Sequence, residues 1–144
     1  MIEPDTVKLL RECDAGIKMG VSSIDDVLNY VENDRLKEIL INNKHDHEQL
    51  GLEVEKKLRE CGDEGKEPSA IAKGMSWIKS NLKLELKKSD KTVADLITDG
   101  CDMGVKSLSR YLNQYKAADE ESKDIAKRLI LLEEKLGVDI RGYL

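Results

Sequence analysis

The 144-residue sequence contains no phenylalanine and two prolines, and aromatic residues make up only 3% of it. Strands of β-sheets are enriched in aromatic and β-branched residues, so this composition argues against an all-β architecture. Because only Pro4 and Pro68 could interrupt them, long helices are permitted. The core must consist mainly of Leu, Ile, Val and Met, the usual filling between packed helices.

The chain also lacks a concentrated basic surface, a long apolar run and a paired cysteine pattern. Its net charge is −5 with both signs interspersed, which argues against a nucleic-acid partner. No stretch approaches the roughly 18 apolar residues of a membrane span, and no signal peptide is visible at the N-terminus. Three cysteines without paired spacing suit a reducing compartment. We therefore expect a cytoplasmic protein of bacterial type that does not enter a membrane.

What the sequence does have is apolar residues at every third or fourth position, which is typical of amphipathic helices. Four long segments and one shorter segment show this spacing, and polar stretches with helix-capping residues separate them. We predict one all-α domain over residues 1–144. It consists of a helical hairpin over about 5–62, a crossover helix over about 68–87 and a second hairpin over about 89–142.

The two hairpins share a short motif. Residues 13–18, Cys-Asp-Ala-Gly-Ile-Lys, match residues 101–106, Cys-Asp-Met-Gly-Val-Lys, at four of six positions and at an offset of 88. With a shift of one residue the second helices also align, and His47 then corresponds to Leu136. A repeat of this length predicts a duplicated hairpin. Two such hairpins can bury their apolar stripes against each other.

Glycines at a spacing of four occur in the first long helix, at Gly16 and Gly20, and in the third, at Gly100 and Gly104. Glycine is costly inside a helix, so its recurrence indicates a packing requirement. We expect these glycines to form notches at which helix backbones approach closely.

Three polar residues are candidates for chemistry. Asp14 and Asp102 occupy equivalent positions beside the apolar stripes, where they could face each other and bind a divalent metal. Alternatively they pair with lysines such as Lys18 and Lys106, and this structural interpretation is preferred. His47 lies on the apolar face of the second helix, where a single histidine is more often a hydrogen-bonded core residue than a metal ligand.

Cys13 and Cys101 are also equivalent and are predicted to face the core. They could form a disulfide or a metal-binding thiol pair. However, buried free cysteines usually act as small hydrophobic residues, and no basic neighbour would make either thiol reactive. Because no phosphate-binding loop, nucleophile elbow or zinc-binding spacing occurs, no catalytic residue is predicted.

Two helical hairpins joined by a long crossover resemble the ferritin-like superfamily, and in particular small bacterial four-helix-bundle proteins of that type. The resemblance is carried by the twin Cys-Asp-x-Gly segments, by Lys44-x-x-His47 in the second helix and by Glu133-x-x-Leu136 in the fourth. Di-iron members use one Glu from each of the first and third helices and a Glu-x-x-His from each of the other two. In this chain Lys replaces the Glu of one motif, and Leu replaces the His of the other.

The resemblance therefore implies a degenerate di-iron site. The most that could survive is a single-metal remnant formed by Asp14, His47, Asp102 and Glu133, able to hold Fe, Mn or Zn. No other cofactor is expected.

Three functions remain open at this point. The first is a non-catalytic ferritin-like bundle that acts through self-association, as a homodimer in the simplest case, or through binding another protein. Surplus apolar residues on the crossover helix motivate it: Met75, Trp77, Ile78, Leu82 and Leu84. The second is a metal-binding oxidoreductase or storage protein with an unconventional site. The third is a thiol-based sensor that uses Cys13 and Cys101.

Overall fold

The structure is a computed structural model that describes residues 2–63, 65 and 77–144. Within these residues every regular element is a helix, which confirms the all-α prediction. The helices are α1 (Pro4–Leu28), α2 (Asp34–Glu60), α4 (Trp77–Leu84), α5 (Asp90–Gln114), α6 (Glu120–Ile140) and the short 3₁₀ helix η1 (Arg141–Tyr143). None of these described helices combines the length and apolar character needed to cross a membrane. The first part of the expected crossover helix, with Met75, lies outside the described residues.

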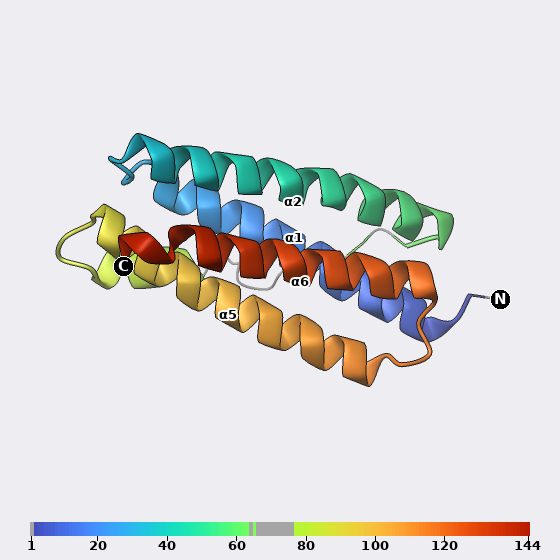
Figure 1. The fold of residues 1–144 in the computed structure, drawn as a ribbon. Helices are drawn as coiled ribbons and strands as arrows, with labels where there is room; N and C mark the ends of the chain where they lie inside the picture. The colour runs from blue at the N-terminus through green and yellow to red at the C-terminus, as the bar shows by residue number, and fades with distance from the viewer. Residues whose placement is uncertain (1, 64, 66–76) are drawn as a thin grey trace.

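Four long helices lie side by side, and the direction of the chain defines their topology (Figure 1). From the N-terminus, α1 runs one way along the bundle and α2 returns beside it. Helix α4 and the start of α5 lie at the end of the bundle where α2 begins, so that α5 runs in the same direction as α2. The last helix, α6, lies against α5 and runs parallel to α1. Two antiparallel hairpins joined by a long crossover are therefore the arrangement of the chain.

The helix ends follow local capping chemistry. The side chain of Asn33 accepts a hydrogen bond from the Leu36 amide at 3.0 Å, and that of Asp119 accepts one from the Ser122 amide at 2.8 Å. Gly62, directly after α2, has a φ of 73°, the left-handed conformation that commonly ends a helix and that glycine adopts without a steric penalty. These ends lie close to where the sequence pattern puts them.

Each hairpin loop is held by the first helix of the other hairpin. The Asp90 carboxylate, in the first turn of α5, accepts hydrogen bonds from the amides of Glu32 and Asn33 in the α1–α2 loop, at 2.8 and 3.1 Å. At the opposite end of the bundle, Asp5 in the first turn of α1 accepts one from the Ala117 amide in the α5–α6 loop at 3.0 Å. These reciprocal contacts fix the two hairpins against each other at both ends.

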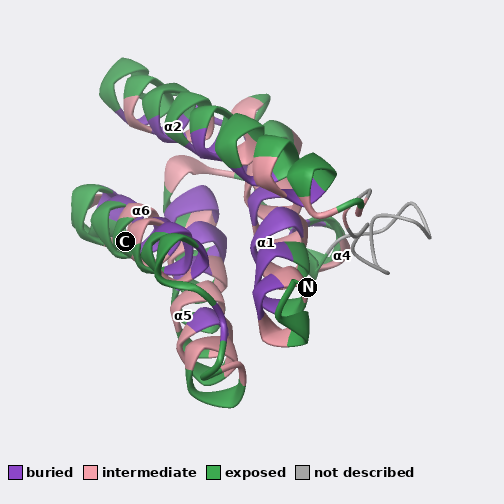
Figure 2. Ribbon diagram, turned by 90° about the vertical axis from the view of Figure 1, so that its right-hand side faces the viewer, coloured by how far each residue is buried: buried purple, intermediate pink, exposed green. Residues whose placement is uncertain are grey.

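The buried faces of the long helices point inward, toward one another (Figure 2). Their apolar side chains form two core clusters, one toward each end of the bundle. One cluster includes Leu36, Leu40 and Ile140 together with residues of α4, and the other includes Leu10, Val54 and Leu129. Between the two clusters the polar side chains of Asn43, His47 and Glu133 are buried. The core is thus interrupted near its middle.

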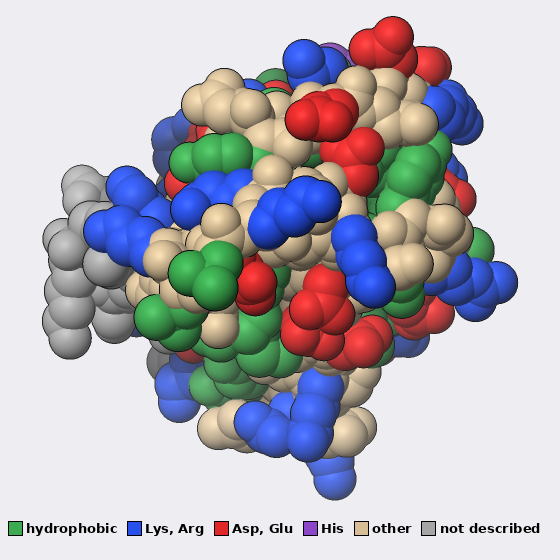
Figure 3. Space-filling view, turned by 90° about the vertical axis from the view of Figure 1, so that its left-hand side faces the viewer, with side chains coloured by type: hydrophobic (Ala, Val, Ile, Leu, Met, Phe, Trp, Pro, Cys, Tyr) green, Lys and Arg blue, Asp and Glu red, His purple; other side chains and the backbone are tan. Residues whose placement is uncertain are grey.

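Helix α4 covers one end of this core. Its Ile78 and Leu82 are buried in the first cluster, so the prediction that they belong to an exposed interface is wrong. They lie one helical turn apart on the face turned toward α1 and α5. Trp77 and Leu84 keep 37% and 80% of their surface exposed. Figure 3 views the molecule from this end, where hydrophobic side chains lie among interspersed acidic and basic ones.

Candidate functional site

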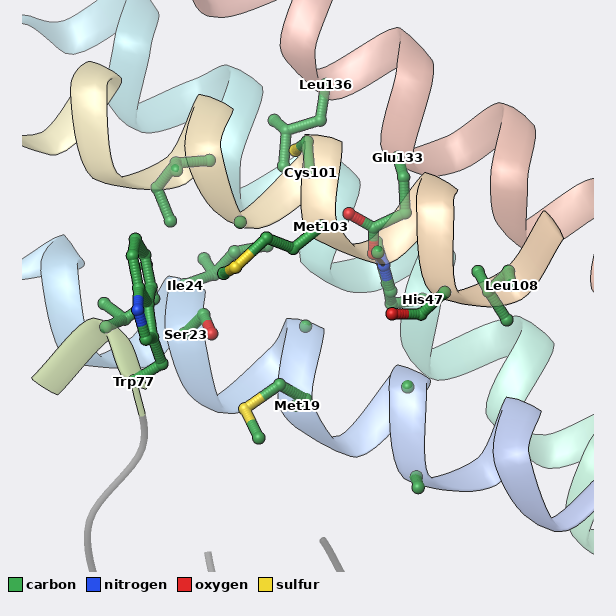
Figure 4. A pocket seen from close by; sticks show the side chains of 18 of the residues that line it. Met19, Ser23, Ile24, His47, Trp77, Cys101, Met103, Leu108, Glu133 and Leu136 are labelled. Atoms are coloured by element: carbon green, nitrogen blue, oxygen red, sulfur yellow. Dashed lines mark hydrogen bonds and ion pairs between the residues drawn. The ribbon is translucent and has the colours of Figure 1, made fainter. Parts of the chain in front are cut away.

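A cavity of about 390 Å³ lies between α1 and α5. Its walls run from Glu12 to Ile24 on α1 and from Ile97 to Tyr111 on α5, so it extends about 18 Å along the helices. Trp77 of α4 lies at one end, and side chains from α2 and α6 reach the interior (Figure 4). We refer to it as the α1–α5 cavity. Its volume falls in the range of roughly 300–1,000 Å³ that is typical of small-molecule sites.

The four glycines of the sequence analysis all line the α1–α5 cavity. A methyl group added at Gly20 would lie 2.9 Å from the His47 ring, and one at Gly104 would lie 3.4 Å from Glu133 Oε2. The nearest atoms to these two glycines are therefore side chains from α2 and α6, and the prediction of close backbone contact is wrong there. The glycines leave room for two polar side chains that come from the far side of the bundle.

His47 is completely buried, with 0% of its surface exposed, and is bonded through both ring nitrogens. Nδ1 lies 3.0 Å from the main-chain carbonyl oxygen of Asn43, and Nε2 lies 2.9 Å from Glu133 Oε1. A carbonyl can only accept, so Nδ1 carries a hydrogen. The expectation of a hydrogen-bonded core histidine is confirmed. His45, two residues earlier, is exposed.

The His47–Glu133 contact is an ion pair when the imidazole is protonated. Burial by itself would lower the pKa of His47, but the hydrogen bond and negative charge of Glu133 outweigh it, and the pKa is raised above the ordinary value. The imidazolium then donates from both nitrogens, one to Asn43 and one to Glu133. The side-chain amide of Asn43 in turn donates to the main-chain carbonyl of Leu132 at 3.2 Å, which connects α2 to α6.

Cys101 completes the polar group inside the cavity. Burial, and then the charge and hydrogen bond of Glu133, raise the pKa of its thiol far above the ordinary value, so that it remains protonated. A protonated thiol in contact with a carboxylate donates to it. Glu133, itself only 9% exposed, therefore binds His47 directly, and its charge acts on the protonated Cys101 thiol beside it.

The four-ligand metal remnant is not assembled. Of its members, only His47 and Glu133 come together. Asp14 instead binds Lys18 at 2.9 Å beside a separate hollow near the end of α2, and Asp102 is exposed on the surface. Each aspartate follows a core-facing cysteine by one position, about 100° around the helix, so it points in a different direction from the cysteine. Asp14 is buried there and Asp102 is exposed, so the two carboxylates do not meet. Among the described residues no group of three or more His, Cys, Asp or Glu side chains could hold a metal ion.

The thiol pair is not assembled either. Cys13 and Cys101 are both buried and free, as expected, but they belong to different core clusters at different ends of the bundle. Burial, followed by the charges of Glu12 and Asp14, raises the pKa of Cys13 to about 12. Neither thiol is a reactive thiolate at neutral pH. Their repeat-equivalent positions therefore do not bring them together: α1 and α5 run antiparallel (Figure 1), and each cysteine packs into a different core cluster.

Several residues that line the α1–α5 cavity were not identified from sequence. Met19 and Met103 lie directly beside Gly20 and Gly104, outside the apolar stripes, and Figure 4 shows both side chains at the cavity. The sequence did carry a signal for these two residues: each is an apolar side chain that lies next to a helical glycine and outside the apolar stripe.

Lys44, the cation of the degenerate motif, pairs with Asp25 of α1 at 2.6 Å rather than with Glu133.

Compared with known proteins, the sequence matches no family model and no curated protein.

Proposed function

We propose that this protein is a non-catalytic ferritin-like bundle whose function is to bind a small, largely apolar molecule in the α1–α5 cavity. The observation that carries the proposal is the elongated cavity with the buried His47–Glu133 pair in its wall. Apolar residues from α1, α4, α5 and α6 supply most of its wall, and His47 and Glu133 supply a fixed polar point. A mostly apolar pocket with a few convergent polar groups is the usual form of a small-molecule site.

The ferritin-like part of the proposal is supported by the direction of the helices and by the reciprocal loop contacts. A hairpin, a long crossover and a second hairpin is a recognised four-helix-bundle topology. Asp5 and Asp90 hold equivalent loops in exchange, as a pseudo-two-fold axis between duplicated hairpins would require. The amide of Asn43 contacts the carbonyl of Leu132, its counterpart in the aligned repeat, which is expected of residues near such an axis.

The binding proposal is tested with 1-octanol as the probe and Trp77 as the reporter. Trp77 is the single tryptophan of the chain and lies at one end of the α1–α5 cavity. We expect a saturable change in its emission, together with a rise in Tm that grows with octanol concentration because the ligand binds only the folded state. Fluorescence titration and thermal unfolding measure the two effects.

A matched pair of serine variants locates the binding site. Ser107 lines the cavity and Ser109, two residues along α5, does not; both are partly buried. Ser107→Leu fills part of the space and should weaken octanol binding by about tenfold or more, the scale of an overpacked site. Ser109→Leu should leave the affinity unchanged. Absence of saturable binding, or equal loss in both variants, would refute the proposal.

Self-association is a second candidate function, favoured by the exposure of Trp77 and Leu84 on α4. Exposed apolar side chains of this size are typical of protein contact sites when they are grouped. Sedimentation at several concentrations should then show a dimer that Trp77→Ala weakens. A concentration-independent monomer for both proteins would eliminate this candidate.

A further inference from the structure

We infer that the ligand of the α1–α5 cavity is a chain-like apolar molecule with a hydrogen-bond donor, such as an alcohol, and that Glu133 recognises the donor. This inference rests on the proposed function and specifies the chemistry of its ligand. It follows from which hydrogen bonds the buried polar residues have already made and which they can still make.

The His47–Glu133 pair can accept a further hydrogen bond but cannot donate one. Both N–H groups of the imidazolium are used, toward Asn43 and Glu133. A carboxylate has about four acceptor positions, and the hydrogen bond from His47 uses one of those of Glu133. Within the pair, the unused acceptor positions therefore belong to Glu133. The Oδ1 atom of Asn43 is also buried without a hydrogen-bond partner, but Asn43 does not line the cavity. A second carboxylate, Glu12, lines the cavity only at the end away from Ile24 and Trp77. Ser23 and Ser107 also line the cavity, but a hydroxyl donates and accepts equally well and does not discriminate.

The glycine at position 104 gives the cavity access to this carboxylate. A Cβ atom there would lie 3.4 Å from Glu133 Oε2, so the missing side chain leaves that oxygen facing α5. In Figure 4 the His47 and Glu133 side chains meet beside the α5 ribbon, and the labelled apolar side chains of Ile24, Met103 and Trp77 lie to one side of them. A ligand can thus place its donor at Glu133 and its apolar part toward Trp77.

The length of the apolar part follows from the helix geometry. Toward Trp77, the last residue of α5 that lines the cavity is Ile97. It lies seven residues from Gly104, or about 10 Å along the helix. Side chains of Ile24, Trp77, Ile78 and Leu136 surround this half of the cavity. An eight-carbon chain fits that length when extended. A fatty carboxylate of equal length would instead bring a second negative charge to the buried Glu133, which is unfavourable unless a proton is taken up.

The test compares three probes of nearly equal size on the wild-type protein: 1-octanol, its isomer 1-methoxyheptane, which has an oxygen but no donor, and octanoate. We expect octanol to bind about five- to tenfold more tightly than the ether, the ratio that one net hydrogen bond supports. Octanoate should bind no better than the ether at pH 7.5. Trp77 emission with competition titration gives the three Kd values.

Two repeat-equivalent glycine variants assign the preference to Glu133. Gly104→Ala places a methyl group against Oε2 at an ordinary contact distance, whereas Gly16→Ala places one 3.5 Å from the Leu129 side chain. Gly104→Ala should reduce the octanol-to-ether ratio to about one. Gly16→Ala should shift both affinities together and keep the ratio. Circular dichroism and thermal unfolding verify that both variants are folded.

The possible failures separate this inference from the proposed function. If octanol and the ether bind with equal affinity, or octanoate binds most tightly, the donor assignment is overturned while the binding function stands. If the ratio survives in Gly104→Ala, Glu133 is not the recognising group. If no probe binds, both the inference and the proposed function are overturned. The wild-type comparison decides whether the ligand requires a donor even if one variant does not fold.

Discussion

The α1–α2 and α5–α6 hairpins are alike at their ends and different in the middle. At the ends, each loop is held by an aspartate from the first turn of the other hairpin, Asp90 for one and Asp5 for the other. Cys13 and Cys101, the equivalent core positions, are both buried and protonated. The shared features therefore belong to the assembly of the bundle.

The middle of each hairpin carries different chemistry. His47 of the first hairpin aligns with the apolar Leu136, and Glu133 of the second aligns with Lys44. The buried His47–Glu133 pair takes one residue from each hairpin. The residues aligned with this pair, Leu136 and Lys44, do not form a second pair, because Lys44 binds Asp25. The difference means that the bundle holds one asymmetric polar point rather than two related ones. Such a point suits a single ligand with a defined orientation.

The largest expected effect comes from breaking this polar point on one side only. Glu133→Leu leaves the imidazolium of the fully buried His47 without its counter-charge and should lower the free energy of unfolding by about 3–5 kcal/mol. Adding His47→Leu to it, which copies the residue at the aligned position 136, should recover most of that loss because the pair is then replaced by apolar groups. Urea denaturation of the wild type, both single variants and the double variant measures the coupling.

The same four proteins report the charge state of the pair. The pKa of His47 is raised in the folded state. Its contribution to the free energy of unfolding is therefore complete below the unfolded pKa of about 6.5 and declines as pH rises through the folded pKa. Glu133 and Asp46 are the acidic groups whose charges raise it. The stability difference between wild type and the double variant should therefore shrink from pH 6 to pH 9. A difference that grows over this range would show that His47 is neutral in the folded protein.

Much of this fold could be predicted from the sequence because it depends on local signals. The three-to-four spacing of apolar residues, the cap at Asn33 and the left-handed Gly62 each involve residues within a few positions of one another. The Asp14–Lys18 ion pair, one helical turn apart, is of the same kind. Such interactions are set by the helix itself and need no knowledge of the partner helices.

The site could be predicted only in part because it depends on contacts between distant segments. His47 was recognisable as a polar residue on an apolar face, but its partner lies 86 residues away. The glycines indicated a steric requirement, yet whether a glycine admits another backbone, a side chain or a ligand is decided by the opposite helix. Asp5 and Asp90 carry no local sign of their loop contacts, which span 112 and 58 residues.

The smallest expected effect on stability distinguishes the two glycines of α1, Gly16 and Gly20. One faces an apolar side chain and the other faces the buried His47 ring. Gly20→Ala would put a methyl group 2.9 Å from the buried His47 ring, and moving that ring strains both of its hydrogen bonds. The overpacking cost of about 1–3 kcal/mol should exceed the roughly 1 kcal/mol that alanine gains over glycine in a helix. Gly16→Ala meets only a Leu129 methyl group at 3.5 Å and should gain stability by up to about 1 kcal/mol.

The two substitutions should therefore shift Tm in opposite directions, which thermal unfolding measures. The direction of the Tm shift in Gly20→Ala is the decisive result. If Gly20→Ala is also stabilising, the His47 ring has room to move and the ion pair is not rigidly positioned. A fixed Glu133 acceptor would then have no structural basis, because Glu133 is held in place by the same ring. If it is destabilising while Gly16→Ala is not, glycine at position 20 is required by the side chain of His47 and not by the approach of another helix.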